Sequence, residues 1–344
     1  MSSGLSSDQI IKYEIMEKVT VHRDDGIVTR IFPEGSNQDQ RLIADGGLTF
    51  SYNGVDYGSC DAGWFFKSTK NGKTEYEPII ALEGTDALNR GSSGDAQYQR
   101  FHHALGAVKN GQIGIYYLRE GKCPLQLDLY EMAYNATIHE DGEGAYLIIQ
   151  DLKVVNDLLD LICKYGRYSN EVKKYLNDYA EWMHNVWKTK KFSSYTFDWA
   201  TYAKKRSTIM GTDYIIKYNG RMKRNYTDGS QRAGHIAVGE MFLSKYLFYG
   251  KKVYYLSPRM SQADVDELDC TKKEDKEWAL LRCEENVYYK TRDDIIGLPS
   301  EINEKLQSIT TEPLKNGTPA MATYKECLKE IVAGLENGKY SLRK

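Results

Sequence analysis

The stretch from residue 62 to residue 118 constrains the fold of this chain more than any other part of it. An Asn-Gly turn joins two segments of strand composition, and a capped helix pattern and an apolar segment follow them. Two paired strands, a helix and a buried strand in succession are typical of an α/β sheet. The expected elements are strands at 62–68 (AGWFFKS), 76–82 (YEPIIAL) and 113–118 (IGIYYL), a turn at 70–73 (KNGK) and a helix at 96–108.

The rest of the chain adds helices and strands on both sides of this stretch. Apolar residues at helical or alternating spacing predict each of them. We expect a core domain over residues 1–150 and a helical and α/β region over 151–344, unless both form one continuous domain. The predicted segments are helices at 8–22, 152–164 and 170–188, a strand at 48–52 before the turn Asn53-Gly54, a helix and strand within 229–256, and a charged, partly helical tail from 273.

The composition argues against several classes of protein. No run of about 18 apolar residues is present, and the first residues lack the charged start and apolar centre of a signal peptide. The six cysteines contain no C-x-x-C pair, so the sequence indicates neither a zinc site nor a disulfide framework. We therefore expect a soluble, intracellular, cytoplasmic protein with reduced thiols and no membrane partner.

Two acidic residues stand where a metal-dependent hydrolase needs them. Asp61 is at the start of the first hairpin strand and Glu83 at the end of the second, with 21 residues between them. The start of one hairpin strand lies opposite the end of its partner, so the two carboxylates should meet at one end of the sheet. Phosphodiester hydrolysis needs an activated water and charge relief at the phosphate, and hard cations held by carboxylates supply both. We expect Asp61 and Glu83 to bind Mg²⁺.

At these residues the chain resembles the PD-(D/E)XK nucleases, which include most type II restriction endonucleases. Cys60-Asp61 stands where the family has Pro-Asp, and Glu83-Gly84-Thr85 stands where it has (D/E)-x-K. The resemblance covers roughly residues 57–118. It implies an α/β fold with a restriction-endonuclease-like core, a central mixed sheet flanked by helices, and an additional α-rich or α/β region.

The resemblance also implies a function. We expect a Mg²⁺-dependent endonuclease that hydrolyses double-stranded DNA, with cleavage in the first half of the chain and recognition in the second. A symmetric recognition site is matched by two identical subunits, so a homodimer is expected. The alternatives are a non-specific repair or phage-type nuclease of the same fold, and a catalytically inactive nucleic-acid-binding module.

The third position of the motif departs from the family pattern. Thr85 replaces Lys and removes the group expected to orient or activate the attacking water. The hydroxyl of Thr85 could orient water, although it is a poor base. Lys67 on the partner strand and His103 on the following helix are the other candidates for this role. Because neighbouring residues on a helix point apart, at most one of His102 and His103 faces the site.

Two further groups of residues are candidates for DNA contacts. One group lies in the first turns of the predicted helix at 96–108, and its alternative role is a solvated helix face. The other lies within residues 188–224, a stretch of net charge about +8 in a chain of net charge −2, which an uneven solvated surface would also explain. The candidate DNA-binding residues are Gln97, Gln99 and Arg100 in the first group and Lys217, Arg221, Lys223 and Arg224 in the second.

Overall fold

The computed structural model describes most of the chain and divides it into two compact units, Met1–Ser194 and Tyr195–Lys344. The division falls later than the expected boundary at residue 150, because two long helices that follow this boundary pack on the first unit. The described residues are 5–19, 26–31, 48–89, 94–140, 142–192, 198–218, 231–267, 279–281, 284–312 and 314–344.

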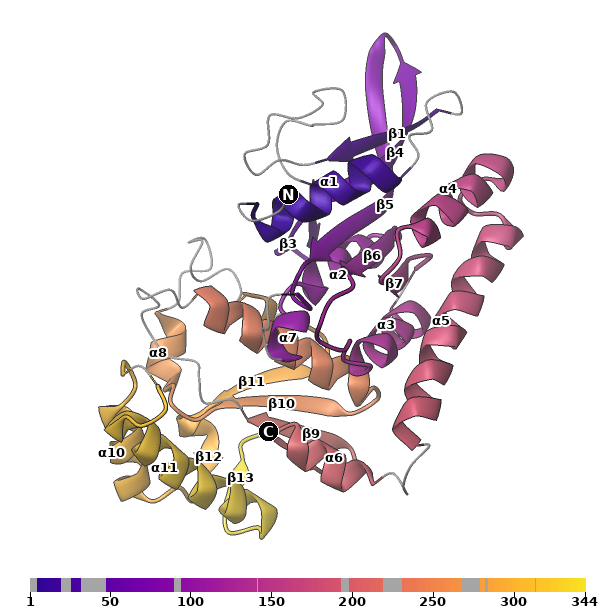
Figure 1. The fold of residues 1–344 in the computed structure, drawn as a ribbon. Coiled ribbons are helices and arrows are strands. Elements are labelled where there is room, and N and C mark those ends of the chain that lie inside the picture. Colours follow the sequence, from indigo (N-terminus) through magenta and orange to yellow (C-terminus); the bar gives the residue numbers. More distant parts are fainter. Residues whose placement is uncertain are drawn as a thin grey trace. The chain divides into compact units, whose positions relative to one another are not determined.

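The first unit contains a five-stranded mixed sheet in the order β1-β4-β5-β6-β7 (Figure 1). The β1–β4 and β4–β5 pairs are antiparallel, whereas the β5–β6 and β6–β7 pairs are parallel. The expected α/β fold with a mixed central sheet flanked by helices is therefore confirmed. The strands are β1 (Ile27–Ile31), β4 (Ala62–Lys70), β5 (Lys73–Thr85), β6 (Ile113–Leu118) and β7 (Ala145–Ile149), and a separate hairpin consists of β2 (Leu48–Tyr52) and β3 (Val55–Cys60).

Both predicted Asn-Gly turns are present. Asn53 and Gly54 have φ of 50° and 78°, and Asn71 and Gly72 have φ of 51° and 77°. Two consecutive residues of positive φ match the right-handed twist of the strands that they join, and Asn and Gly tolerate this conformation best. The β4–β5 hairpin, which carries the two acids, is thus specified by its own sequence.

Helices cover both faces of this sheet. A Cβ atom at Gly84 of β5 would lie 2.4 Å from Ile11 Cγ2 of α1, and one at Gly114 of β6 would meet the backbone of Ala104 in α2. Gly84 and Gly114 have opposite orientations in the sheet, so α1 and α2 pack on opposite faces. The helices of this unit are α1 (Ser7–Lys18), α2 (Phe101–Lys109), α3 (Asp128–His139), α4 (Lys153–Tyr165) and α5 (Asn170–Phe192).

Two predicted helix boundaries were wrong. The helix expected at 96–108 begins only at Phe101, because the 3₁₀ helix η1 (Gly94–Gln97) and a turn occupy the preceding residues. Gln97 and Gln99 therefore precede α2 and do not lie on its face. The helix expected at 8–22 ends at Lys18, where Val19 adopts an extended backbone.

The second unit is also α/β, as expected for the additional region. Its four-stranded sheet has the order β11-β10-β9-β8, in which only the β8–β9 pair is antiparallel. The predicted helix and strand within 229–256 are α7 and β10. The elements are α6 (Trp199–Lys205), β8 (Thr208–Met210), β9 (Tyr214–Tyr218), α7 (Gln231–Leu247), β10 (Lys252–Ser257), α8 (Gln262–Asp266), β11 (Val287–Thr291), η2 (Arg292–Asp294), β12 (Ile295–Ile296), α10 (Ser300–Ser308), α11 (Pro319–Glu336) and β13 (Ser341–Leu342).

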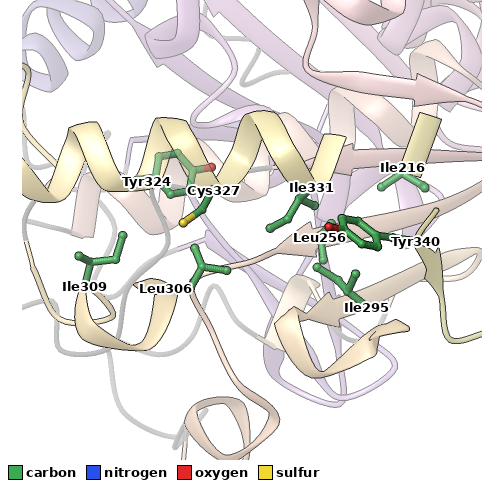
Figure 2. Close-up of a cluster of buried hydrophobic side chains, with 9 residues drawn as sticks. All are labelled: Ile216, Leu256, Ile295, Leu306, Ile309, Tyr324, Cys327, Ile331 and Tyr340. Carbon is green, nitrogen blue, oxygen red and sulfur yellow. The ribbon is translucent and has the colours of Figure 1, made fainter. Parts of the chain in front are cut away.

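A hydrophobic cluster fixes the C-terminal helices to this second sheet. Figure 2 shows Leu306 of α10 and Ile331 of α11 together with Ile216 of β9 and Leu256 of β10. All four side chains are buried, and each apolar side chain removed from water contributes about 2 kcal/mol. In the described parts of both units, no helix has the length and apolar character needed to cross a membrane.

Candidate active site

Asp61 and Glu83 come together at the carboxyl end of β5. Asp61 is the residue between β3 and β4, and its backbone N–H donates to the carbonyl of Leu82 at 2.9 Å. Its carboxylate Oδ2 accepts from the Gly84 N–H at 2.9 Å. Both acids are buried, with 7% of Asp61 and 1% of Glu83 exposed. The hairpin pairing thus places two carboxylates side by side in a region with little water.

This environment disfavours negative charge on Asp61. Burial raises the pKa of the Asp61 carboxyl well above its ordinary value, and the charge of Glu83 raises it further. The Gly84 N–H, Lys12 and Arg100 act in the opposite direction. Burial and the same two acids also raise the pKa of the Cys60 thiol, so Cys60 stays protonated and is not a nucleophile.

Glu83 contacts two basic side chains at the start of α2, Arg100 and His103. Arg100 Nη1 lies 2.9 Å from Glu83 Oε1 and 3.0 Å from Oδ1 of Asp8, and Glu83 raises the Arg100 pKa further. His103 Nδ1 lies 3.3 Å from Glu83 Oε2. Gly58, with φ of 98°, makes this approach possible, because a Cβ atom there would come within 2.4 Å of the His103 ring. Arg100 and His103 are therefore part of the site.

Lys12 is a site residue that the sequence analysis did not identify. Its Nζ lies 3.5 Å from Asp61 Oδ1, and its side chain is only 6% exposed. Ile11 packs against Gly84 and so holds α1 against β5. The next residue, Lys12, therefore lies close to Asp61. Lys12 and Asp61 are 49 positions apart. No local spacing relates them, and the sequence predicted a helix here but not the strand on which it packs.

Two of the three candidates to replace the missing Lys are not positioned to orient or activate the attacking water. Lys67 is exposed and pairs with Tyr76. It lies six positions from Asp61 along the strand, a distance of about 20 Å, so Lys67 is outside the site. Thr85 lies on the same face of β5 as Glu83 and is buried, but its Oγ1 accepts from the Ala87 N–H at 3.2 Å. The Thr85 hydroxyl therefore stabilises the turn that follows β5.

The structure corrects two of the expected DNA contacts. Gln97 is buried, where its amide donates to the Pro124 carbonyl at 3.1 Å and accepts from the Gln126 N–H at 2.8 Å. Lys217 is buried too, and its ammonium donates to the Arg206 carbonyl at 2.6 Å. Both side chains hold loops together and do not face solvent. Gln99 is half-buried, and Arg221, Lys223 and Arg224 lie outside the described residues.

The donor set of the site fits a hard divalent cation. Asp61 and Glu83 provide carboxylate oxygens, which Mg²⁺ prefers, and a divalent charge would offset their mutual repulsion. No group of three or more His, Cys, Asp or Glu side chains suited to a metal occurs in the part of the chain that the structure describes. Mg²⁺ commonly takes one or two carboxylates and completes its coordination with waters and substrate phosphates.

Comparisons with known proteins do not identify a relative. No protein-family model matches the chain, and the curated proteins and the solved structures gave no significant match.

Proposed function

We propose that this chain is a Mg²⁺-dependent nuclease of the PD-(D/E)XK type that hydrolyses phosphodiester bonds of double-stranded DNA. The observation that carries the proposal is the pair of buried carboxylates, Asp61 and Glu83, at the carboxyl end of β5. Burying two like charges side by side costs stability, and neutral residues of similar size would serve a structural role better. The two acids lie at the hairpin and apolar strand that carry the resemblance, and α2 follows them in the chain.

Asp61 and Glu83 would hold Mg²⁺, which when bound activates water and offsets the negative charge of a phosphate. Lys12 contributes a nearby ammonium group, although the motif position of the family's Lys is occupied by Thr85. This ammonium favours the ionised form of Asp61 and can donate a hydrogen bond to a water or a phosphate oxygen. His103 contributes an imidazole, a group that can accept or donate a proton during hydrolysis.

One observation favours a second candidate function. Arg100 and His103 both contact Glu83, as in an ion-pair network that only stabilises a fold. This arrangement would suit a nucleic-acid-binding module without catalytic activity. Catalysis remains the better explanation, because among the described residues Asp61 forms an ion pair with Lys12 alone, and burial still raises the Asp61 pKa.

Incubation of supercoiled plasmid DNA with the protein separates these functions. We expect cleavage with Mg²⁺, none with EDTA, and binding without cleavage with Ca²⁺, whose looser coordination positions water less well. Discrete bands would identify a site-specific, restriction-type enzyme, and a smear a non-specific nuclease. Plasmid that is bound but intact with both Mg²⁺ and Mn²⁺ would contradict the proposal and favour the binding module.

Substitutions at the three original candidates for the missing Lys should have unequal effects. We expect Thr85→Ala to reduce the single-turnover cleavage rate by less than about tenfold, because its hydroxyl bonds to the Ala87 N–H. His103→Ala should reduce the rate by on the order of a hundredfold, because it removes a proton-transfer or positioning group. Lys67→Ala should leave the rate unchanged when the protein is in saturating excess over the DNA. A thousandfold loss with Thr85→Ala would instead assign the orientation of water to this hydroxyl.

A further inference from the structure

The β4–β5 hairpin extends beyond the rest of its sheet (Figure 1). β1 pairs with β4 only as far as Phe66, and β6 pairs with β5 only from Ile80 onwards. Residues 67–77, here named the ribbon, therefore pair mainly with one another, and all of them are exposed. At the base of the ribbon, Glu77 pairs with Phe66, and the Lys67 N–H donates to the Gly26 carbonyl at 2.8 Å. An isolated two-stranded ribbon has little stability in water. A ribbon exposed on both faces gains little from packing within its own unit.

The two faces of the ribbon have different side chains. Lys67 pairs with Tyr76 and Thr69 with Thr74, which puts these four residues on one face. Arg30 of β1 joins them, because its guanidinium lies 4.7 Å from the centre of the Tyr76 ring. We name this set of five residues the donor face.

The opposite face carries acids as well as bases. Ser68 pairs with Glu75 and Lys70 with Lys73, and Lys70 lies 3.5 Å from Glu75 in an ion pair. Glu77 adds a second carboxylate to this face. It therefore has no excess of positive charge and is the natural control for the donor face.

Every side chain of the donor face can donate a hydrogen bond, and none carries negative charge. Within the described part of the chain, neither Arg30 nor Lys67 forms an ion pair with a carboxylate. Arg, Lys, Thr and Tyr are the side chains that contact phosphate oxygens in protein–DNA complexes. A two-stranded β-ribbon also has the dimensions to enter the major groove. The chemistry of the donor face thus matches the backbone of a nucleic acid duplex.

We propose that the donor face of the ribbon binds the phosphate backbone of double-stranded DNA away from the scissile bond. This inference rests on the proposed nuclease function, which supplies the DNA. Lys67 lies about 20 Å along the strand from Asp61, a span of about six base pairs at 3.4 Å each. The ribbon therefore strengthens binding of flanking DNA without touching the reacting phosphate.

The test compares two double variants that remove the same charge from opposite faces. Arg30→Gln with Lys67→Gln changes the donor face, and Lys70→Gln with Lys73→Gln changes the other. Binding of a fluorescent duplex of about 30 base pairs is measured in Ca²⁺ at several salt concentrations. We expect the slope of log affinity against log salt to flatten by about two in the first variant and to stay unchanged in the second. In Mg²⁺, the first variant should raise KM and leave kcat unchanged.

Several results would overturn the inference. Equal slopes in the two variants would show that only bulk charge matters. Conversion of a dimer to a monomer by the donor-face variant would assign this face to a second copy of the chain. If Arg30→Gln disturbs folding through its ring contacts, the exposed Lys67→Gln alone should still flatten the slope by about one.

Failure of the inference is distinguishable from failure of the nuclease function. Cleavage in Mg²⁺ with a wild-type salt slope in the donor-face variant would overturn the inference and leave the nuclease function intact. A flattened slope in a protein that never cleaves DNA would support the ribbon contact and overturn the nuclease function.

Discussion

Replacement of Asp61 by Asn or of Glu83 by Gln is expected to reduce the rate of DNA cleavage by on the order of a thousandfold or more, with DNA still bound. Each change removes one charged oxygen ligand and keeps the shape of the side chain. Loss of about 4 kcal/mol of transition-state stabilisation corresponds to this factor. Single-turnover cleavage in Mg²⁺ measures the rate, and anisotropy of labelled DNA in Ca²⁺ measures binding.

Asp86→Asn is the matched control for these two variants. Asp86 is a buried acid that directly follows β5, and it pairs with Arg119 at 3.1 Å. Its change removes a buried charge near the same strand end, so it reports any general loss of stability. We expect Asp86→Asn to keep cleavage within about tenfold of the wild type. Similar losses in all three variants would argue that the acids support folding and that the active site lies elsewhere.

Lys12→Met is expected to reduce cleavage by on the order of a hundredfold and to move the acid side of the pH–rate profile to higher pH. Lys12 lowers the Asp61 pKa, whereas burial and Glu83 raise it. Removing the ammonium therefore raises this pKa again, and a higher pH is needed to ionise the carboxylate. Met keeps the length of the side chain in its buried position. Cleavage rates between about pH 6 and pH 9 measure the shift.

Two companion variants separate charge from packing at this position. Lys12→Arg keeps a cation beside Asp61 and should retain the wild-type pH profile, even where the rate falls. Lys18→Met changes an exposed lysine on the same helix, which pairs with Glu14 at 3.4 Å, and should leave rate and profile unchanged. A Lys12→Met enzyme with a lower rate but an unshifted profile would show that Lys12 acts through packing alone.

The parts of the site that the sequence predicted depend on local pairing. The Asn71-Gly72 turn sets the register of β4 and β5, and this register brings Asp61 next to Leu82 and Glu83. A hairpin of fixed register needs no information from distant parts of the chain. The sequence could therefore predict that both acids lie at one end of the sheet.

The remaining site residues depend on contacts between distant segments. Lys12 reaches Asp61 only because α1 packs on β5, and apolar spacing predicts a helix but not the strand on which it packs. Lys67 was expected near the site because it lies on the same strand as the site. Its position far along that strand, however, places it about 20 Å from Asp61. Gln97 was expected to contact DNA because it is polar, and Lys217 because it lies in the positively charged stretch 188–224, but both side chains are buried and bond to backbone carbonyls. Polarity alone does not predict exposure.

The packing of Ile11 on Gly84 also predicts how related chains should differ from one another. A side chain at position 84 has no space while Ile11 is present, because its Cβ would lie 2.4 Å from Ile11 Cγ2. A homologue with a larger residue at position 84 therefore needs a smaller one at position 11, or a helix docked further out. A helix docked further out would also separate the ammonium of residue 12 from the acids. Positions 84, 11 and 12 should consequently covary, and a chain that has regained Lys at position 85 should be free to lose Lys12.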